Sequence, residues 1–403
     1  MNTAPQLLKG FRDFLPEDAI SRQWLRENIA TVFERWGYDP METPTLEPLE
    51  LFEGQIGEDE KLFFKFEDPG GRKVALRYDQ TVPTCRVVGD HAQELPMPFK
   101  RYQIQPAFRA EKPQRGRYRE FLQCDADIFG ITSPYADAEV IALSLDVYRQ
   151  LGFTSARALI SNRALLKDIP YQAIVAIDKL KKVGAEGVLK EMTMKGISLS
   201  DAKGYLRLVT TLAPDETTQA ILEYLEDSGF SQEWFTFEPT IARSFSYSDG
   251  PIWEIEIPGF TGGSVLGGER YDQLVKKISG VDVPGTGFGL GFDRTLEAAQ
   301  QFGLVPKKKT VTRVLIGLFN AEVLPQCLEI ARGLRDQGVN TDLYPDPSAK
   351  LDKQLKYADK KGIPYVVIVG PDEVTNGTAT VKDMSRKTQQ TIPLATLPDF
   401  LRE

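Results

Sequence analysis

The residues best suited to chemistry gather in one segment, FRAEKPQRGRYREFLQCDADIFG, at residues 108–130. Four arginines lie within eleven residues and are followed by an aromatic ring and two aspartates: Arg109, Arg115, Arg117, Arg119, Phe121, Asp125 and Asp127. An arginine binds phosphate bidentately, an aromatic ring stacks on a nucleobase, and a carboxylate holds a cation or an N–H donor. These residue types favour a site for a nucleotide and an amine.

The spacing matters because side chains alternate between the two faces of a strand. From Arg117 onward the odd-numbered residues are polar except for Phe121, with basic residues at one end and acidic residues at the other. The even-numbered residues are largely apolar and can pack on a core. At ~3.3 Å per residue this polar wall would be roughly 30 Å long, enough for a nucleotide and a second small molecule. The alternative is a solvent-facing strand of mixed charge, and the separation of the charges argues against it.

The overall composition restricts the chemistry further. The chain has 403 residues, which predicts two or three domains, and its net charge of −8 gives no indication of nucleic-acid binding. Its single histidine, His91, lies in a polar, turn-like stretch, which argues against a Ser-His-Asp or Cys-His mechanism. Three scattered cysteines form no CxxC pair, which argues against a zinc site and fits a reducing, cytoplasmic compartment. No apolar run is long enough to span a membrane.

The periodicity of the first 310 residues predicts a mixed α+β region. Apolar spacing near 3.6 predicts helices, and alternation predicts strands. The expected elements are a helix at 18–37, a hairpin at 61–79, two strands at 99–110 and 118–129, a helix at 135–151, and two further strands at 252–259 and 262–272. Residues from about 163 to 235 have a mostly helical pattern with no strand-like run. We therefore expect a helical insertion into a sheet-forming domain that spans residues 1–310.

The pattern changes at residue 311, after the linker at 304–310. Strands are predicted at 313–319, 339–345 and 363–370, with helices at 321–338 and 350–362 between them. This alternation predicts a separate α/β domain at 311–403. Its 12 Lys/Arg and 12 Asp/Glu give a net charge of 12 − 12 = 0, so its charge does not indicate RNA binding. Lys353, Lys356 and Lys360 share one helix face, which is a solvated face or a binding face.

Several segments resemble the histidyl-tRNA synthetases, which are class II aminoacyl-tRNA synthetases. YDPMETPTLEPLELF (38–52, with Pro44) is similar to motif 1, residues 108–130 to motif 2, and GTGFGLGFDR (285–294) to motif 3. LRYDQTVP (76–83), IARSFSYSDGPIWEIEI (241–257) and SVLGGERYDQL (264–274) resemble the substrate-binding and histidine-specific segments. The likeness runs from residue 9 to the C-terminal end of the sequence. It implies an antiparallel catalytic sheet, a C-terminal anticodon-binding domain and a homodimer.

The resemblance also implies which residues bind ATP. Arg109 would hold the α-phosphate, Arg117 and Arg294 the β- and γ-phosphates, and Glu111 the adenine amino group. Phe121 would stack on the adenine. Mg²⁺ is implied as an accompanying ion. Arg115, in the loop between the two expected strands, is free to face the tRNA, whereas the sequence does not separate a role of Arg119 in the site from packing or an ion pair.

The amino acid implied is histidine. Gln123 would contact its backbone, Asp79 and Thr81 would take its ammonium group, and Asp127 would accept a hydrogen bond from its imidazole. The remaining residues implied for this site are Arg243, which would stand beside the α-phosphate as a catalytic arginine, together with Tyr247 and Tyr271. For Arg243 the alternative is a surface ion pair, and for Tyr271 it is a core tyrosine.

Two positions depart from the family pattern. Ser248 stands where a second, pocket-lining tyrosine is usual, and Glu269 stands where a glycine is expected. Both departures bear on the imidazole pocket rather than on ATP binding.

The activity implied is histidine–tRNA ligation: histidine is activated to the adenylate with ATP and then transferred to the 3′ end of tRNA(His). One alternative is a non-ligase paralogue such as the regulatory subunit of ATP phosphoribosyltransferase, which usually lacks the anticodon domain. Another is an RNA-binding module built on an inactive synthetase domain. The retained Arg109, Arg117, Arg243 and Arg294 favour the enzyme.

Overall fold

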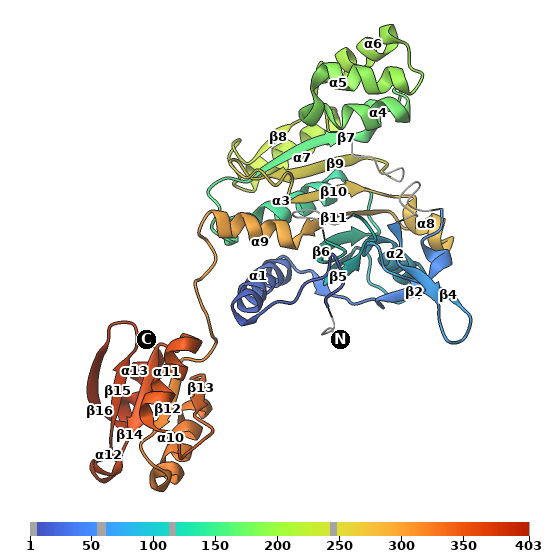
Figure 1. The fold of residues 1–403 in the computed structure, drawn as a ribbon. Coiled ribbons are helices and arrows are strands. Elements are labelled where there is room, and N and C mark those ends of the chain that lie inside the picture. Colours follow the sequence, from blue (N-terminus) through green and yellow to red (C-terminus); the bar gives the residue numbers. More distant parts are fainter. Residues whose placement is uncertain (1–5, 55–61, 113–117, 242–247, 403) are drawn as a thin grey trace. The chain divides into compact units, whose positions relative to one another are not determined.

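The computed structural model describes residues 6–54, 62–112, 118–241 and 248–402 (Figure 1). It divides into two compact units. The larger unit comprises Met1–Arg12 and Leu25–Val305, and the smaller comprises Asp13–Trp24 and Pro306–Glu403. None of the helices in the described ranges is long and apolar enough to cross a membrane.

An eight-stranded sheet forms the centre of the larger unit. In spatial order its strands are β1 (Asp39–Pro40), β5 (Phe99–Phe108), β6 (Glu120–Phe129), β11 (Gly285–Gly291), β10 (Leu266–Arg270), β9 (Pro251–Glu256), β7 (Arg157–Asn162) and β8 (Phe235–Phe237). The two edge pairs, β1 with β5 and β7 with β8, are parallel, and the five inner pairs are antiparallel. The predicted antiparallel catalytic sheet is therefore confirmed.

Helices cover one face of this sheet: the second half of α1 (Pro16–Arg35), with α3 (Pro134–Gln150) and α9 (Phe292–Gln301). The Phe33 ring of α1 lies 5.4 Å from the Tyr102 ring and 5.8 Å from the Phe288 ring. The even-numbered residues of β6 from Cys124 to Ile128 are buried, as their apolar pattern predicts. The odd-numbered residues must then face the opposite side of the sheet.

A smaller layer borders the first strands. It consists of the three-stranded sheet of β2 (Leu46–Pro48), β4 (Lys73–Leu76) and β3 (Lys65–Glu67), the short helix η1 (Leu49–Leu51), and α2 (Thr81–Asp90), which packs against α8 (Leu274–Ser279). The predicted hairpin is confirmed, since β3 and β4 pair antiparallel. Asp68 shapes its turn by accepting hydrogen bonds from the N–H groups of Gly70 and Arg72, and Gly71 has the positive φ of 75° that the turn requires.

The region between β7 and β8 is helical. After η3 (Arg163–Leu166) it contains α4 (Tyr171–Ile177), α5 (Leu180–Met194), α6 (Leu199–Thr210) and α7 (Glu216–Asp227). Residues from Leu166 to Val209 contribute to a core of their own, and Figure 1 shows α4, α5 and α6 grouped beyond the β7 edge of the sheet. By contrast, α7 packs against α3 and the edge strands. The helical segment therefore consists of one self-contained cluster and one helix that supports the sheet.

The smaller unit contains a five-stranded sheet in the order β13 (Thr341–Leu343), β12 (Val314–Leu318), β14 (Tyr365–Val369), β15 (Thr378–Asp383) and β16 (Thr388–Pro393). Its helical elements are η4 (Ala321–Val323), α10 (Leu324–Asp336), α11 (Leu351–Lys361), α12 (Pro371–Asn376), η5 (Leu394–Thr396) and α13 (Leu397–Arg402). The three predicted strands are present and run parallel. The antiparallel β15–β16 hairpin is an addition, and β16, TQQTIP, is almost wholly exposed and lacks the apolar alternation that would have predicted it.

Candidate active site

A cavity of about 310 Å³ lies against the sheet face that the helices leave uncovered. Nine of the twelve residues predicted for the site line it: Asp79, Thr81, Arg109, Glu111, Phe121, Gln123, Asp127, Tyr271 and Arg294. The other three, Arg117, Arg243 and Tyr247, lie outside the described residues, as does Arg115. The wall is formed by the segment that follows β5, by β6, by the glycines of β11 and by β10, so segments more than 200 residues apart in the sequence build one cavity.

Arg109 is held in a fixed orientation at one end of the cavity. Its Nε donates to the Tyr78 carbonyl oxygen at 3.3 Å. Its guanidinium carbon lies 4.4 Å from the centroid of the Tyr78 ring and 5.0 Å from that of Phe121. Because cation–π contacts on two sides restrict a guanidinium, its donors are directed before any ligand arrives. Arg109 occupies one face of the Phe121 ring, so a nucleobase stacking on Phe121 would take the other face.

Two further arginines, Arg294 and Arg12, lie near this basic end. Arg294, in the first turn of α9, donates from Nη1 to the Ser264 carbonyl oxygen at 3.0 Å. Asp293 beside it pairs with Arg12 at 3.0 Å, and the Arg12 guanidinium lies 3.3 Å from the centroid of the Tyr118 ring. Arg109, which follows β5, and Arg294, on α9, thus reach the cavity from two different segments.

Arg119 has a structural role, which decides the question that its sequence left open. Its Nε donates to the Glu111 carbonyl oxygen at 3.0 Å, and its Nη1 donates to that of Lys9 at 3.3 Å. Its backbone N–H donates to the Gly10 carbonyl oxygen at 2.9 Å. Arg119 therefore braces the chain behind the cavity, and it is not among the residues that line it.

Asp127 sits at the acidic end, 2% exposed, between two partners. Tyr271 donates its hydroxyl hydrogen to Oδ1, and Arg101 Nη2 lies 2.5 Å from Oδ2 as an ion pair whose angles are not those of a hydrogen bond. Burial raises the pKa of the Asp127 carboxyl, and Arg101 opposes that rise. A Cβ atom at Gly287 would lie 1.9 Å from Asp127 Oδ1, so the carboxylate leans over a position that only glycine can occupy.

Tyr271 packs as a core residue and also lines the cavity. Its ring is 2% exposed and packs edge-on against Phe129 with centroids 6.0 Å apart, as a core tyrosine does. Its hydroxyl reaches Asp127 at the cavity wall. The adjacent Arg270 points to the other side of the strand, where it forms a buried ion pair with Asp137 at 2.8 Å and anchors α3.

Gln123 and Asp125 form a second polar pair on the same face of β6. Gln123 Nε2 donates to both carboxylate oxygens of Asp125 at 2.9 Å. Asp125 is buried and does not line the cavity, contrary to its place on the predicted polar wall. Burial raises the pKa of Asp125 to about 8, with Arg101 opposing and Asp127 adding to the rise.

The raised pKa of Asp125 gives a pH-dependent prediction. A carboxyl whose pKa is higher in the folded chain than in the unfolded chain contributes stability at low pH, and that stability is lost as the pH rises through the folded value. Asp125→Asn should therefore increase the free energy of unfolding at pH 8 and leave it nearly unchanged at pH 3, below the pKa of about 3.9 of an unfolded aspartate. The difference should grow by at most about 1.4 kcal/mol per pH unit between those values. Urea unfolding at several pH values measures it, with the exposed Asp352→Asn as control; parallel pH curves for Asp125→Asn and wild type would contradict it.

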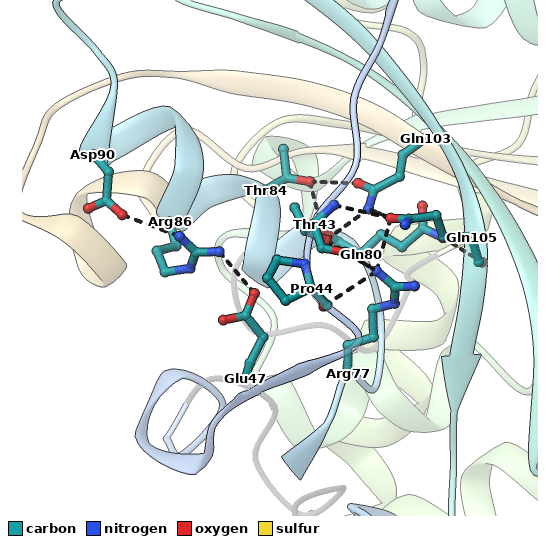
Figure 2. Close-up of polar contacts among 10 residues, drawn as sticks. All are labelled: Thr43, Pro44, Glu47, Arg77, Gln80, Thr84, Arg86, Asp90, Gln103 and Gln105. Carbon is teal, nitrogen blue, oxygen red and sulfur yellow. Dashed lines mark hydrogen bonds and ion pairs between the residues drawn. The ribbon is translucent and has the colours of Figure 1, made fainter. Parts of the chain in front are cut away.

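The segment that carries Asp79 and Thr81 is anchored from behind by Arg77, which is 0% exposed. As Figure 2 shows, Arg77 reaches the motif 1 segment and β5 together. Its Nη1 donates to the Thr43 carbonyl oxygen at 2.8 Å, the Pro44 carbonyl oxygen at 3.4 Å and Gln105 Oε1 at 2.9 Å. Its Nε donates to the Pro106 carbonyl oxygen at 2.6 Å. A guanidinium buried with this many acceptors positions backbone rather than ligand.

Gln80 completes the anchoring, between the two residues that face the cavity. Its Nε2 donates to the carbonyl oxygens of Gln105 at 2.7 Å and Gln123 at 3.0 Å. This ties the beginning of α2 to the backbone of β5 and β6. Asp79 accepts the N–H of Val82 at 3.2 Å, and burial raises the pKa of its carboxyl. An amine arriving at Asp79 would meet a carboxylate with little freedom to move.

The two departures from the family pattern contact each other. Ser248 donates its hydroxyl hydrogen to Oε2 of Glu269. Both side chains are nearly buried, at 8% and 6% exposure, and Glu269 lines the cavity. The small serine thus stands beside the longer side chain, so the two changes form one local arrangement.

Residues missed by the sequence reasoning include Arg101 and the glycines of β11. Arg101, Gln103 and Gln105 alternate along β5, and this period of polar residues was the available signal that β5 presents a polar face toward the site. The glycines of GTGFGLG recur at every second position. Such a strand has one face without side chains, which is what a ligand lying on the sheet requires.

Other groups stand apart from the cavity. His91 is exposed, and its Nδ1 lies 3.2 Å from Glu94 Oε2. Within the described ranges no group of three or more His, Cys, Asp or Glu side chains is arranged to hold a metal ion. The three cysteines are buried and unpaired.

Two family models match the sequence: Histidyl-tRNA synthetase over residues 10–183 and Anticodon binding domain over residues 301–403. A histidine–tRNA ligase of Gloeobacter violaceus is 36% identical over 96% of this chain and 96% of its own length. The crystal structure of histidyl-tRNA synthetase from Nostoc sp. PCC 7120 superposes with a TM-score of 0.87 at 25% identity and covers 100% of this chain and 99% of that one. An ATP phosphoribosyltransferase regulatory subunit/histidyl-tRNA synthetase from Bacillus halodurans C shares the fold, with a TM-score of 0.71 at 24% identity, over 88% of this chain and 97% of that one.

Proposed function

Because this chain belongs to the histidyl-tRNA synthetase family, we propose that it is a histidine–tRNA ligase that activates histidine with ATP and transfers it to the 3′ end of tRNA(His). The observation that carries the proposal is the convergence of nine predicted residues on one cavity, with arginines at one end and Asp127 at the other. A nucleotide and a small amine laid end to end along β6 match that distribution of charge.

The first step is the attack of the histidine carboxylate on the α-phosphorus of ATP, with release of pyrophosphate. A transition state that spreads negative charge over phosphoryl oxygens requires fixed positive charge rather than a general base. Arg109 supplies it at the α-phosphate, and Arg117 and Arg294 hold the β- and γ-phosphates. Arg243 stands beside the α-phosphate as the second catalytic arginine. A chain whose only histidine is distant from the cavity can work by this chemistry.

The residues of the other end bind and orient histidine. Asp79 and Thr81 take its ammonium group, and Gln123 contacts its backbone. Asp127 accepts an imidazole N–H, with Tyr271 fixing the carboxylate and Tyr247 lining the pocket. Glu111 reads the adenine amino group and Phe121 stacks on the adenine.

Mg²⁺ enters this scheme with ATP. Magnesium in nucleotide enzymes is bound mainly by substrate phosphates and water, with one or two carboxylates rather than a dedicated protein cage. The cavity fits this, since Glu111 and Asp293 line it near the arginines while no three-carboxylate cluster occurs in the described ranges. When bound, the ion supplies further positive charge to the phosphates.

The remaining assignments follow from family membership. Residues 1–310 form the catalytic domain, with the helical insertion at about 163–235, and residues 311–403 bind the anticodon. The second step is attack of the terminal adenosine hydroxyl of tRNA on the adenylate. The enzyme works in the cytoplasm as a homodimer, with Pro44 of motif 1 at the interface. The regulatory-subunit alternative is not favoured, because the anticodon-domain match and the cavity arginines are both present.

Histidine-dependent exchange of labelled pyrophosphate into ATP tests the activity. Exchange should occur with histidine and not with other amino acids, and it should not require tRNA. The control is the exposed-site variant Arg72→Ala, which should exchange at the wild-type rate because Arg72 pairs with Asp68 in the hairpin turn and is not among the residues that line the cavity. No exchange by a folded wild-type chain would refute the ligase assignment.

A further inference from the structure

A single row of residues runs across the sheet beneath the acidic end of the cavity. Strand register places Arg101 opposite Asp127, Asp127 opposite Gly287, and Gly287 opposite Glu269. Residues paired in register project on the same face, so the carboxylates of Asp127 and Glu269 flank a glycine. Two strand spacings separate their Cα atoms by roughly 10 Å. Gly287 itself adds no side chain between the two acids, and the Asp127 carboxylate leans over it.

Both carboxylates are oriented by neighbouring side chains. Tyr271 and Arg101 hold Asp127, and Ser248 donates to Oε2 of Glu269. Each acid also lines the cavity, so each presents part of its carboxylate to a ligand. The Ser248 hydroxyl fixes the direction of the Glu269 carboxylate.

The charges around Glu269 come from several elements. Asp127 on β6 and Arg101 on β5 lie along the row. Arg163 follows β7 and lies near Glu269. Burial lowers the pKa of Arg163, and the charge of Glu269 opposes that lowering. Asp79 faces the cavity from the beginning of α2, and Tyr271 does so from the end of β10. Glu269 is thus one of three carboxylates at this end.

We propose that Glu269 is a specificity-determining residue that contacts the ring of the amino-acid substrate, so that Asp127 and Glu269 together bind histidine as its imidazolium cation. This rests on the proposed function. A neutral imidazole has one N–H donor and one lone pair, whereas the imidazolium has two donors. Two acceptors on the same face of the sheet, with the Asp127 carboxylate leaning over Gly287, match the cation and would repel the lone pair of the neutral ring. Each charge-assisted bond would take about 2.8 Å.

Binding of histidine, measured by calorimetry without ATP, tests this directly. The wild-type chain should bind histidine at pH 8 with uptake of close to one proton, because free imidazole is largely neutral there and its pKa is near 6.5. Its Kd should be about 25-fold lower at pH 6 than at pH 8, the ratio of the imidazolium fractions for a pKa near 6.5. Repeating the titration in buffers of different ionisation enthalpy measures the proton uptake.

The Glu269→Gln variant keeps the shape of the side chain at this position and removes its negative charge. It should raise the Kd for histidine at pH 6 by about tenfold or more, leave the Kd for ATP within about twofold, and abolish most of the proton uptake. Ser248→Ala should raise the histidine Kd by a smaller factor, since Glu269 would lose its orienting donor. Glu256→Gln is the matched control, because Glu256 lies on the neighbouring strand β9 and pairs with Lys181 at 3.2 Å.

The outcomes separate this inference from the ligase assignment. Wild-type binding of histidine without proton uptake would overturn the inference and leave the ligase intact. Unchanged histidine affinity in a folded Glu269→Gln variant would do the same. Failure of the wild-type chain to bind histidine or to exchange pyrophosphate would overturn the ligase assignment as well. If Glu269→Gln does not fold, the wild-type proton uptake alone decides.

Discussion

Replacing Arg109 with alanine is expected to slow histidine-dependent pyrophosphate exchange by about a hundred- to a thousandfold. The guanidinium is held at the cavity wall by the Tyr78 carbonyl and by the Tyr78 and Phe121 rings, so its charge is in place before ATP binds. A preorganised donor that meets developing negative charge acts mainly in the transition state. The loss should therefore appear in kcat, with a smaller change in the KM for ATP.

Two further variants make the Arg109 result interpretable. Arg109→Lys retains a positive charge but loses the planar fork, and it should recover only part of the activity. Arg72→Ala removes an arginine that is exposed on the β3–β4 hairpin, and it should behave as wild type. An Arg109→Ala enzyme with wild-type kcat would show that the phosphates are bound elsewhere.

Replacing Arg101 with methionine should have the largest effect on stability. Arg101 is fully buried and lies 2.5 Å from Asp127, so its removal leaves a buried carboxylate without its counter-charge. Losing one partner of a buried pair typically costs about 3–5 kcal/mol. Urea unfolding of the variant and wild type measures the difference, and a loss of histidine affinity should accompany it because Asp127 is no longer held.

The neighbouring Lys100→Met variant is the control. Lys100 pairs with Glu139 at 2.6 Å, but both side chains are partly exposed, so its loss should cost less than about 1 kcal/mol. Equal losses in the two variants would contradict the importance of the buried pair.

The Arg101 effect should also depend on pH, and its sign follows from the Asp127 carboxyl. Burial already raises the pKa of Asp127 above that of an unfolded chain, and Arg101 opposes that rise, so removing Arg101 raises the pKa further. A raised folded-state pKa means that stability is lost as the pH increases through that value. The Arg101→Met variant should therefore be most destabilised at pH 8 and partly recover in mild acid.

Local pattern was sufficient to predict much of this protein. The two long strands of motif 2 and the helix after them follow from periods of 2 and 3.6 in neighbouring residues, and the structure has them nearly at the expected bounds. Resemblance in short motifs named the family. The polar wall of β6 was also readable, because alternation along one strand is a property of consecutive residues.

The tertiary structure decided what lies beside that wall. Asp125 shares a face with Asp127, yet it does not line the cavity and accepts hydrogen bonds from Gln123 instead. Ser248 and Glu269 read as separate departures in the sequence, and only the return of β10 brings them together. The row from Arg101 through Asp127 and Gly287 to Glu269 joins four strands whose register is set by hydrogen bonds between segments far apart in the chain. No local pattern encodes that register, so the sequence by itself determined which residues could bind a nucleotide and an amine, and the fold determined which of them meet.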